Sequence, residues 1–258
     1  MRRVLALVLF WTAVLLAVAG GLTAAVGLPV PPGVLLGAAL ATLGLNVLVG
    51  GDLIVAPEAK PFSVKAQVSR AVLDIAAELP DVEVQANTDY ERLATVRALA
   101  GGGPNLEVVD GVAHLRLAQS PAWIPGAANW QARLATNVLW DVKARSLLGH
   151  LTVDLSGIRA DRVDLRSLLG GVHVTCPRRG RPRVELETWL GDLVVVVPRD
   201  VGARVTVEPG RLAHVNLDSA AFDQLDETTF VTHNVETAQT VAVITLRTQA
   251  GEIRVNCL

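Results

Sequence analysis

Four arginines lie close together between positions 178 and 183 and form the strongest local concentration of charge in the chain. They are Arg178, Arg179, Arg181 and Arg183. A cation held near an anionic lipid leaflet can contribute about 1 kcal/mol to binding. The cluster is therefore a candidate contact for an anionic membrane surface or an acidic partner. The alternative interpretation is a solvated turn between two strands.

The other ionisable residues do not form a recognisable reaction centre. Five histidines are spread along the chain without the HExxH or CxxC spacing of a zinc site. The carboxylates are scattered among cations, whereas glycan cleavage needs a pair held several ångströms apart. No GxSxG sequence marks a nucleophilic serine. We therefore expect no catalytic residues, no metal and no cofactor, with an envelope enzyme that acts on glycans as the alternative.

Composition narrows the class of protein further. The chain has 258 residues, of which 51% are apolar and 19% charged. The 23 basic and 25 acidic residues give a net charge of −2, which argues against nucleic acid as the partner. The two cysteines, Cys176 and Cys257, are too few for a disulfide scaffold. Two free thiols fit a reducing compartment, although the sequence leaves a disulfide between them open.

The first 55 residues predict a two-helix transmembrane hairpin. Residues 4–51 contain no Asp, Glu, Lys or Arg, and three prolines at 29, 31 and 32 break this apolar run once. Cations lie at both ends of the hairpin and none lies in its turn, so the positive-inside rule predicts a cytoplasmic β domain on a bacterial cell membrane. The alternative is a cleaved signal peptide, which would place the domain outside the cytoplasm.

The remainder of the chain predicts an all-β domain over residues 63–258, after a proline-marked linker at 56–62. Apolar and polar residues alternate in short runs that are separated by Gly, Pro and Asp. The segments 71–79 and 93–100 fit either a short helix or a strand. For the four tryptophans of this domain we expect packing in the core or a cap; they are Trp123, Trp130, Trp140 and Trp189. For Trp123 and Trp130 an exposed platform for a partner is the alternative.

A repeat of about 21 residues organises the second half of this domain. Each copy is an alternating run with Ser or Thr near its end, a glycine three residues later, and a second alternating run. A divergent unit at 205–207 and a last copy at 244–251 follow the first three copies. The repeat turns fall at Gly149, Gly170, Gly191 and Gly251. One strand pair cannot bury its apolar face alone, so the repeat predicts a solenoid-like or sandwich-like array of two-strand units.

These repeat units and their glycine turns resemble the bacterial toast-rack domain, which is similar to the C-terminal domain of LiaF-like cell-wall-antibiotic response proteins. The predicted hairpin resembles the membrane unit that precedes such domains. The resemblance implies a membrane-tethered, non-enzymatic β module, and it transfers no catalytic residue.

We therefore expect an integral membrane protein with a non-enzymatic β interaction module. Its expected role is envelope-stress sensing, signalling or scaffolding in a bacterium. A protein partner in the envelope and a homo-oligomer are both compatible with this role. A structural, adhesin-like protein outside the membrane is a further alternative.

Overall fold

The computed structural model of the protein describes residues 11–20, 34–42, 60–77, 81–87, 89, 91–98, 104–118 and 130–258. The chain divides into two compact units, Met1–Pro57 and Glu58–Leu258. Strand β1 (Lys60–Val64) already begins inside the segment 56–62 that the sequence predicts to be a linker.

The N-terminal unit contains two short helical stretches, residues 11–20 and 34–42. At about 1.5 Å per residue each extends for roughly 15 Å, about half of a hydrocarbon core of about 30 Å. Among the described residues, no helix combines the length and the apolar character needed to cross a membrane. The predicted two-helix, multi-pass location in a bacterial cell membrane is therefore wrong. The predicted break at prolines 29, 31 and 32 and the other parts of the uncharged run 4–51 lie outside the described residues.

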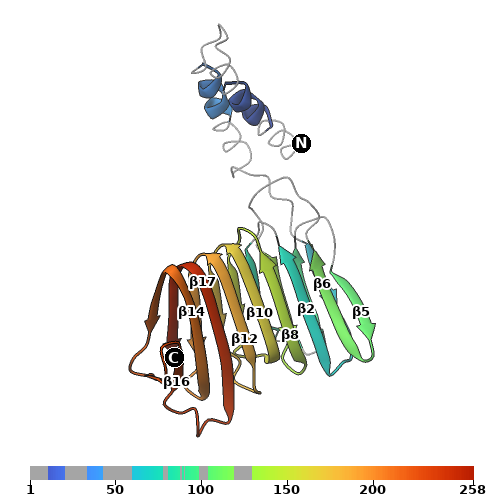
Figure 1. The fold of residues 1–258 in the computed structure, drawn as a ribbon. Coiled ribbons are helices and arrows are strands. Elements are labelled where there is room, and N and C mark those ends of the chain that lie inside the picture. The colour runs from blue at the N-terminus through green and yellow to red at the C-terminus, as the bar shows by residue number, and fades with distance from the viewer. Residues whose placement is uncertain are drawn as a thin grey trace. The chain divides into compact units, whose positions relative to one another are not determined.

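The strands of the C-terminal unit form two layers around one hydrophobic core (Figure 1). In spatial order the front layer contains β6 (Val112–Ala118), β2 (Arg70–Ala77), β8 (Leu139–Ser146), β10 (Arg159–Leu169), β12 (Arg183–Leu190) and the first halves of β17 (Thr240–Cys257) and β14 (Val201–Leu217). The back layer contains β7 (Trp130–Ala135), β3 (Val82–Asn87), β9 (Leu151–Asp154), β11 (Val172–Thr175), β13 (Leu193–Val197) and the second halves of β17 and β14. These neighbours pair in parallel, and one strand from each layer makes a rung.

Antiparallel strands extend the layers at the ends of the stack. β5 (Asn105–Val109) pairs with β6 at the front. At the back, β4 (Ala94–Ala98) pairs with β7, and β1 pairs with β4. At the other end, β16 (Thr229–Thr232) pairs with the first half of β14, and β15 (Phe222–Gln224) pairs with β16. Two segments fit helix or strand in the sequence, 71–79 and 93–100. Their described parts belong mostly to strands, β2 in the first and β4 in the second.

The strand registers confirm the 21-residue repeat and correct the order in which its units stack. Val163 lies beside Val142 and Val184, as the spacing predicts. Ile244, however, lies between Val184 and Val205, because β17 is inserted between β12 and β14. The last copy in the sequence is therefore an interior rung, and the divergent unit at 205–207 belongs to the terminal rung.

Inward-facing aliphatic side chains fill the space between the layers. Along β12 and β17, buried Val184 and Leu186 lie beside buried Ile244 and Leu246. Burial of one such side chain contributes about 1.5–3 kcal/mol. Trp140 is fully buried, and its indole N–H donates to the Ala135 carbonyl oxygen at 2.9 Å. Trp140 therefore packs in the core, as the sequence predicts.

Both cysteines are free thiols, and they differ in exposure. Cys176 is completely buried, and this burial raises its pKa to about 12, whereas Cys257 is half-buried. At pH 8 a thiol with that pKa is about one part in 10,000 thiolate. Partial burial also raises the pKa of Cys257, but Cys257 is only half-buried and can meet a reagent from solvent, whereas Cys176 cannot. We expect iodoacetamide at pH 8 to modify Cys257 at least 100-fold faster than Cys176 in the folded protein. Peptide mass spectrometry measures both rates, and equal rates would contradict the buried position of Cys176.

Candidate functional site

Large apolar side chains are exposed where successive front strands turn toward the back layer. We call this set the apolar ridge; its members are between 38% and 56% exposed, and they are Leu147, Leu148, Leu168, Leu169, Trp189 and Leu190. In each of the three rungs the apolar pair directly precedes a repeat glycine. Soluble proteins rarely leave large contiguous apolar surface uncovered, and such patches mark sites of interaction.

The backbone stacks these turns directly on one another. Leu169 and Leu190 are register partners, and the Leu169 N–H donates to the Leu147 carbonyl oxygen at 2.7 Å. Leu190 in turn lies beside Ala250, and Ala250 lies beside Leu212, which is 75% exposed. The ridge is therefore a continuous line across three neighbouring rungs that ends at Ala250; Leu212, one rung further, is exposed but lies outside the ridge.

A ladder of buried hydroxyl groups holds the turns at this spacing. Ser167 Oγ donates to the Gly149 carbonyl oxygen at 3.4 Å, and Thr188 Oγ1 donates to that of Gly170 at 3.0 Å. Thr248 Oγ1 contacts the Gly191 carbonyl oxygen at 3.4 Å. Thr248 Oγ1 also lies 3.1 Å from the Ala250 carbonyl oxygen of its own turn, and Ser146 Oγ accepts from the Gly149 N–H at 2.9 Å. The hydroxyl three residues before each glycine thus bonds to the backbone of its own turn or of the preceding rung, which explains why Ser or Thr recurs there.

The repeat glycines allow the turns to approach closely. A Cβ on Gly170 would lie 2.4 Å from the Gly149 carbonyl oxygen, and one on Gly191 would lie 2.3 Å from that of Gly170. A Cβ on Gly251 would meet the Gly191 oxygen at 2.2 Å. Gly191 and Gly251 also have positive φ angles of 151° and 131°, which favour glycine. The glycines singled out in the sequence thus lie together in one column beside the ridge.

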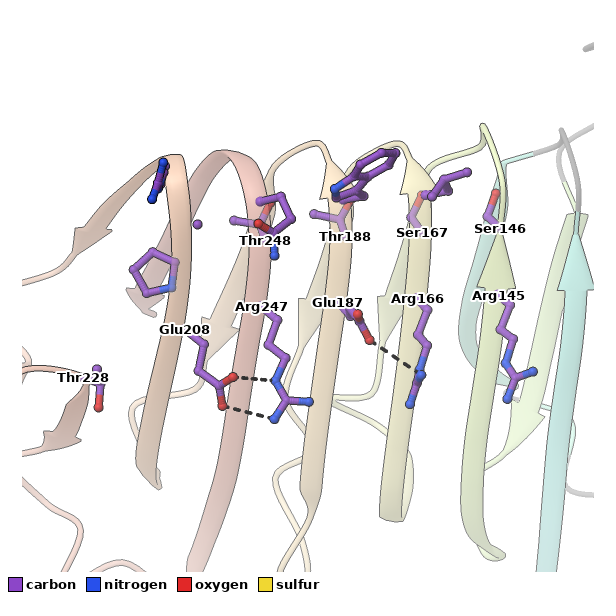
Figure 2. Close-up of a pocket in the computed structure, with 16 residues that line it drawn as sticks. Arg145, Ser146, Arg166, Ser167, Glu187, Thr188, Glu208, Thr228, Arg247 and Thr248 are labelled. Atoms are coloured by element: carbon purple, nitrogen blue, oxygen red, sulfur yellow. Dashed lines mark hydrogen bonds and ion pairs between the residues drawn. The ribbon is translucent and has the colours of Figure 1, made fainter.

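A row of charged side chains crosses the front layer below the ridge. Figure 2 shows it with the row of hydroxyl groups beside it; from β8 to β14 its members are Arg145, Arg166, Glu187, Arg247 and Glu208. An open groove lies along this row, and Trp189, Leu168 and Arg211 also line it. The groove therefore offers a partner both apolar surface and charge.

Ion pairs neutralise most of this row. Arg247 donates to Glu208 at 2.8 and 3.1 Å, and Arg166 Nη1 lies 3.6 Å from Glu187 Oε2. The hydrogen bond from Arg247 lowers the pKa of the Glu208 carboxyl. A side-chain hydrogen bond to Asp164 raises the pKa of Arg166. Glu208 is therefore held as the carboxylate, whereas the general acid of a glycosidase needs a raised pKa.

The four arginines of the sequence cluster lie where the front strands begin, at the opposite strand ends from the ridge. Arg178, Arg179 and Arg181 are exposed in the turn before β12, and Arg183 begins that strand, whose other end carries Leu190 of the ridge. Arg178 lies 3.7 Å from Asp200. The structure therefore does not bring this cluster together with the ridge or the groove.

Trp189 and Trp130 differ in exposure from two of the sequence-based expectations. Trp189 is 56% exposed, so it does not pack in the core or a cap. Trp130 is only 4% exposed, so it is not part of an exposed platform, and Trp123 lies outside the described residues. A signal for the ridge was present in the sequence: successive side chains of a strand alternate in direction, so an adjacent apolar pair cannot face inward together.

One histidine, His150, forms a hydrogen bond between two neighbouring rungs. His150 Nδ1 accepts a hydrogen bond from the Gly171 N–H at 3.0 Å, which links two adjacent rungs beside the glycine column. Within the described part of the chain, no group of three or more His, Cys, Asp or Glu is arranged to hold a metal ion.

The fold and this surface define a class: a two-layer stack of parallel β rungs that presents an apolar ridge beside a neutralised charged groove. No protein-family model matches the chain, and no curated protein matches it. A candidate cell adhesion protein from Clostridium sporogenes has a similar solved structure, with a TM-score of 0.70 and 16% identity, over 78% of this chain and 100% of that one. At this identity the likeness shows the fold alone.

A second solved structure, a candidate adhesin from Bacteroides fragilis, is 9% identical, with a TM-score of 0.33 over 80% of this chain and 100% of that one. A likeness at this TM-score carries no argument about the chain.

Proposed function

We propose that the β unit is a non-enzymatic, adhesion-type binding module whose protein partner docks on the apolar ridge. The observation that carries the proposal is the run of six large apolar side chains exposed on three consecutive rungs. A likeness in fold to a candidate cell adhesion protein supports the same class of function. The LiaF-like resemblance adds a finer proposal, that this binding serves scaffolding or signalling in the bacterial envelope.

The shape and charge of the site favour a protein over a small molecule or a glycan to be cleaved. The groove is open along the rungs, whereas small-molecule sites enclose most of the ligand. An exposed aromatic ring flanked by aliphatic side chains is typical of a protein-binding hot spot. The carboxylates of the groove are paired with arginines, so a hydrolytic role has less support than binding.

Photocrosslinking in cells that express the full chain tests this function. A photoreactive amino acid is placed at Trp189 on the ridge and, as a matched control, at Val243, which is 44% exposed on the front layer away from the ridge. We expect one discrete adduct with another protein from position 189 and none from position 243. No adduct at 189, or the same adduct from both positions, would contradict docking on the ridge.

The partner identified in this way then allows affinity to be measured with purified full-length chain. We expect Trp189→Ser to weaken binding by about 30-fold or more, because truncation of a central aromatic in an interface costs about 2 kcal/mol or more. Val243→Ser should leave the affinity within about twofold, since surface substitutions outside such features change little. Equal affinity of both variants would exclude the ridge as the docking site.

A further inference from the structure

The two layers end differently at the β14 end of the stack. At the front, β16 pairs with Arg204, Val205 and Thr206 of β14, and β15 extends it. At the back, the outermost strand is the second half of β14, residues 210–217, which pairs with β17 on its inner side. Among the described residues no strand pairs with its outer side. We call this segment the β14 edge.

Backbone hydrogen-bonding groups on the β14 edge point away from the stack. The Asp218 N–H donates to the Val255 carbonyl oxygen at 3.1 Å, so Asp218 directs its N–H toward β17. Backbone groups of successive strand residues point to alternate sides. The N–H and C=O groups of Ala213, Val215 and Leu217 are therefore directed outward, available to another strand.

The core is also incompletely covered at this edge. Val215 continues the inward row that contains Ile253, yet it is 40% exposed whereas Ile253 is fully buried. Leu217 continues the row of Val255 and is half-buried. Proteins commonly protect a free edge with an inward-pointing charge, a proline or a covering strand. The inward positions 213, 215 and 217 of this edge carry only apolar residues.

We propose that the β14 edge pairs with the same edge of a second copy of the chain, antiparallel and centred on His214. This surface contains no residue of the ridge and shares only Gly210 and Arg211 with the groove, so the inference does not depend on the proposed function. In this register Ala213 lies opposite Val215 of the second copy, so a small side chain meets a larger one in both halves of the twofold. These are the residues whose backbone groups point outward. The back layers of two copies become one continuous sheet, and Val215 gains cover.

In this register no Arg, Lys, Asp or Glu lies opposite a side chain of like charge. Arg211 lies opposite Leu217 of the second copy, and Leu212 lies opposite Asn216. Asn216 is already oriented by its hydrogen bond to Glu252 at 3.2 Å. Pairing with the same edge of a second copy gives the outward N–H and C=O groups their hydrogen-bond partners. A second copy is present wherever the chain itself is present.

Light scattering on the purified full chain after size exclusion tests the pairing. We expect a mass of about 55 kDa, twice the 27.3 kDa of one chain. Val215→Lys, which puts an inward charge on the edge, should give the monomer mass. The matched control is Val243→Lys, because Val243 is similarly exposed at 44% but lies within the front layer, and this variant should remain dimeric. Thermal unfolding of Val215→Lys verifies that the monomer is folded.

Cysteine trapping tests the register independently of stability. In a Cys257→Ser background, His214→Cys places two thiols across the twofold at a pair that is not hydrogen-bonded, where Cα atoms are about 4.5 Å apart and a disulfide can form. Mild oxidation should yield a covalent dimer, whereas Thr152→Cys, exposed in the middle of the back layer, should not. A monomeric wild-type chain, a dimeric Val215→Lys variant, or no His214→Cys crosslink would each overturn the proposal.

Discussion

Replacement of Gly191 with alanine should lower the free energy of unfolding by about 3 kcal/mol or more. Gly191 has a φ of 151°, and its added Cβ would lie 2.3 Å from the Gly170 carbonyl oxygen and 2.6 Å from its carbonyl carbon. Backbone strain of this kind costs about 1–3 kcal/mol. The obstructing atoms belong to the backbone of the preceding rung, so relief of the clash requires two rungs to separate.

Thermal unfolding followed by circular dichroism measures this effect. For a domain of this size, a loss of about 3 kcal/mol lowers Tm by roughly 6–12 °C. Gly111→Ala is the matched control, because Gly111 also has a positive φ, 77°, but an added Cβ there meets no atom within 4 Å. The control should lose only the cost of the backbone conformation, about 1 kcal/mol. Equal shifts for the two variants would show that the close stacking of the glycine turns contributes no stability.

The sequence predicted the repeating unit well because stacking imposes the same local requirement on every rung. Each copy needs alternating inward residues, a hydroxyl that bonds to the backbone of the turns, and a glycine where the turns approach. The order of the units was not predictable from alternation alone, since Val184, Val205 and Ile244 present equivalent inward faces. A finer signal existed: the copy with Thr248 and Gly251 is complete, whereas the unit at 205–207 continues into Pro209 and Gly210 and is placed at the end.

The candidate site was harder to predict because it depends on where each strand ends. Adjacent apolar residues such as Trp189 and Leu190 resemble core residues by type, and only the turn that follows exposes both. The arginine cluster is the strongest concentration of charge in the sequence, yet it lies at the opposite ends of the front strands from the ridge. At the N-terminus, an uncharged run indicated apolar character correctly, but crossing a membrane also requires helix length, and the described helices are short.

Truncation after residue 239 should abolish cooperative folding of the β unit. The deletion removes β17, which lies between β12 and β13 on one side and β14 on the other. Four of its large side chains, Ile244, Leu246, Ile253 and Val255, are fully buried. At about 1.5–3 kcal/mol each they contribute roughly 6–12 kcal/mol, which is comparable with the entire stability of a typical domain.

The same truncation distinguishes a stack in which β17 lies between β12 and β14 from a stack in which the units follow their order in the sequence. If the units were stacked as they occur in the sequence, β17 would be the terminal rung, and its removal would leave β14 paired with β12. Ile244→Ala provides a milder version that should cost about 2–5 kcal/mol. Leu212→Ala is its control, because Leu212 is 75% exposed on the terminal rung and should change stability by less than about 0.5 kcal/mol. A truncated chain that kept a sharp thermal transition would contradict the interior position of β17, since no other strand could then bridge β12 to β14.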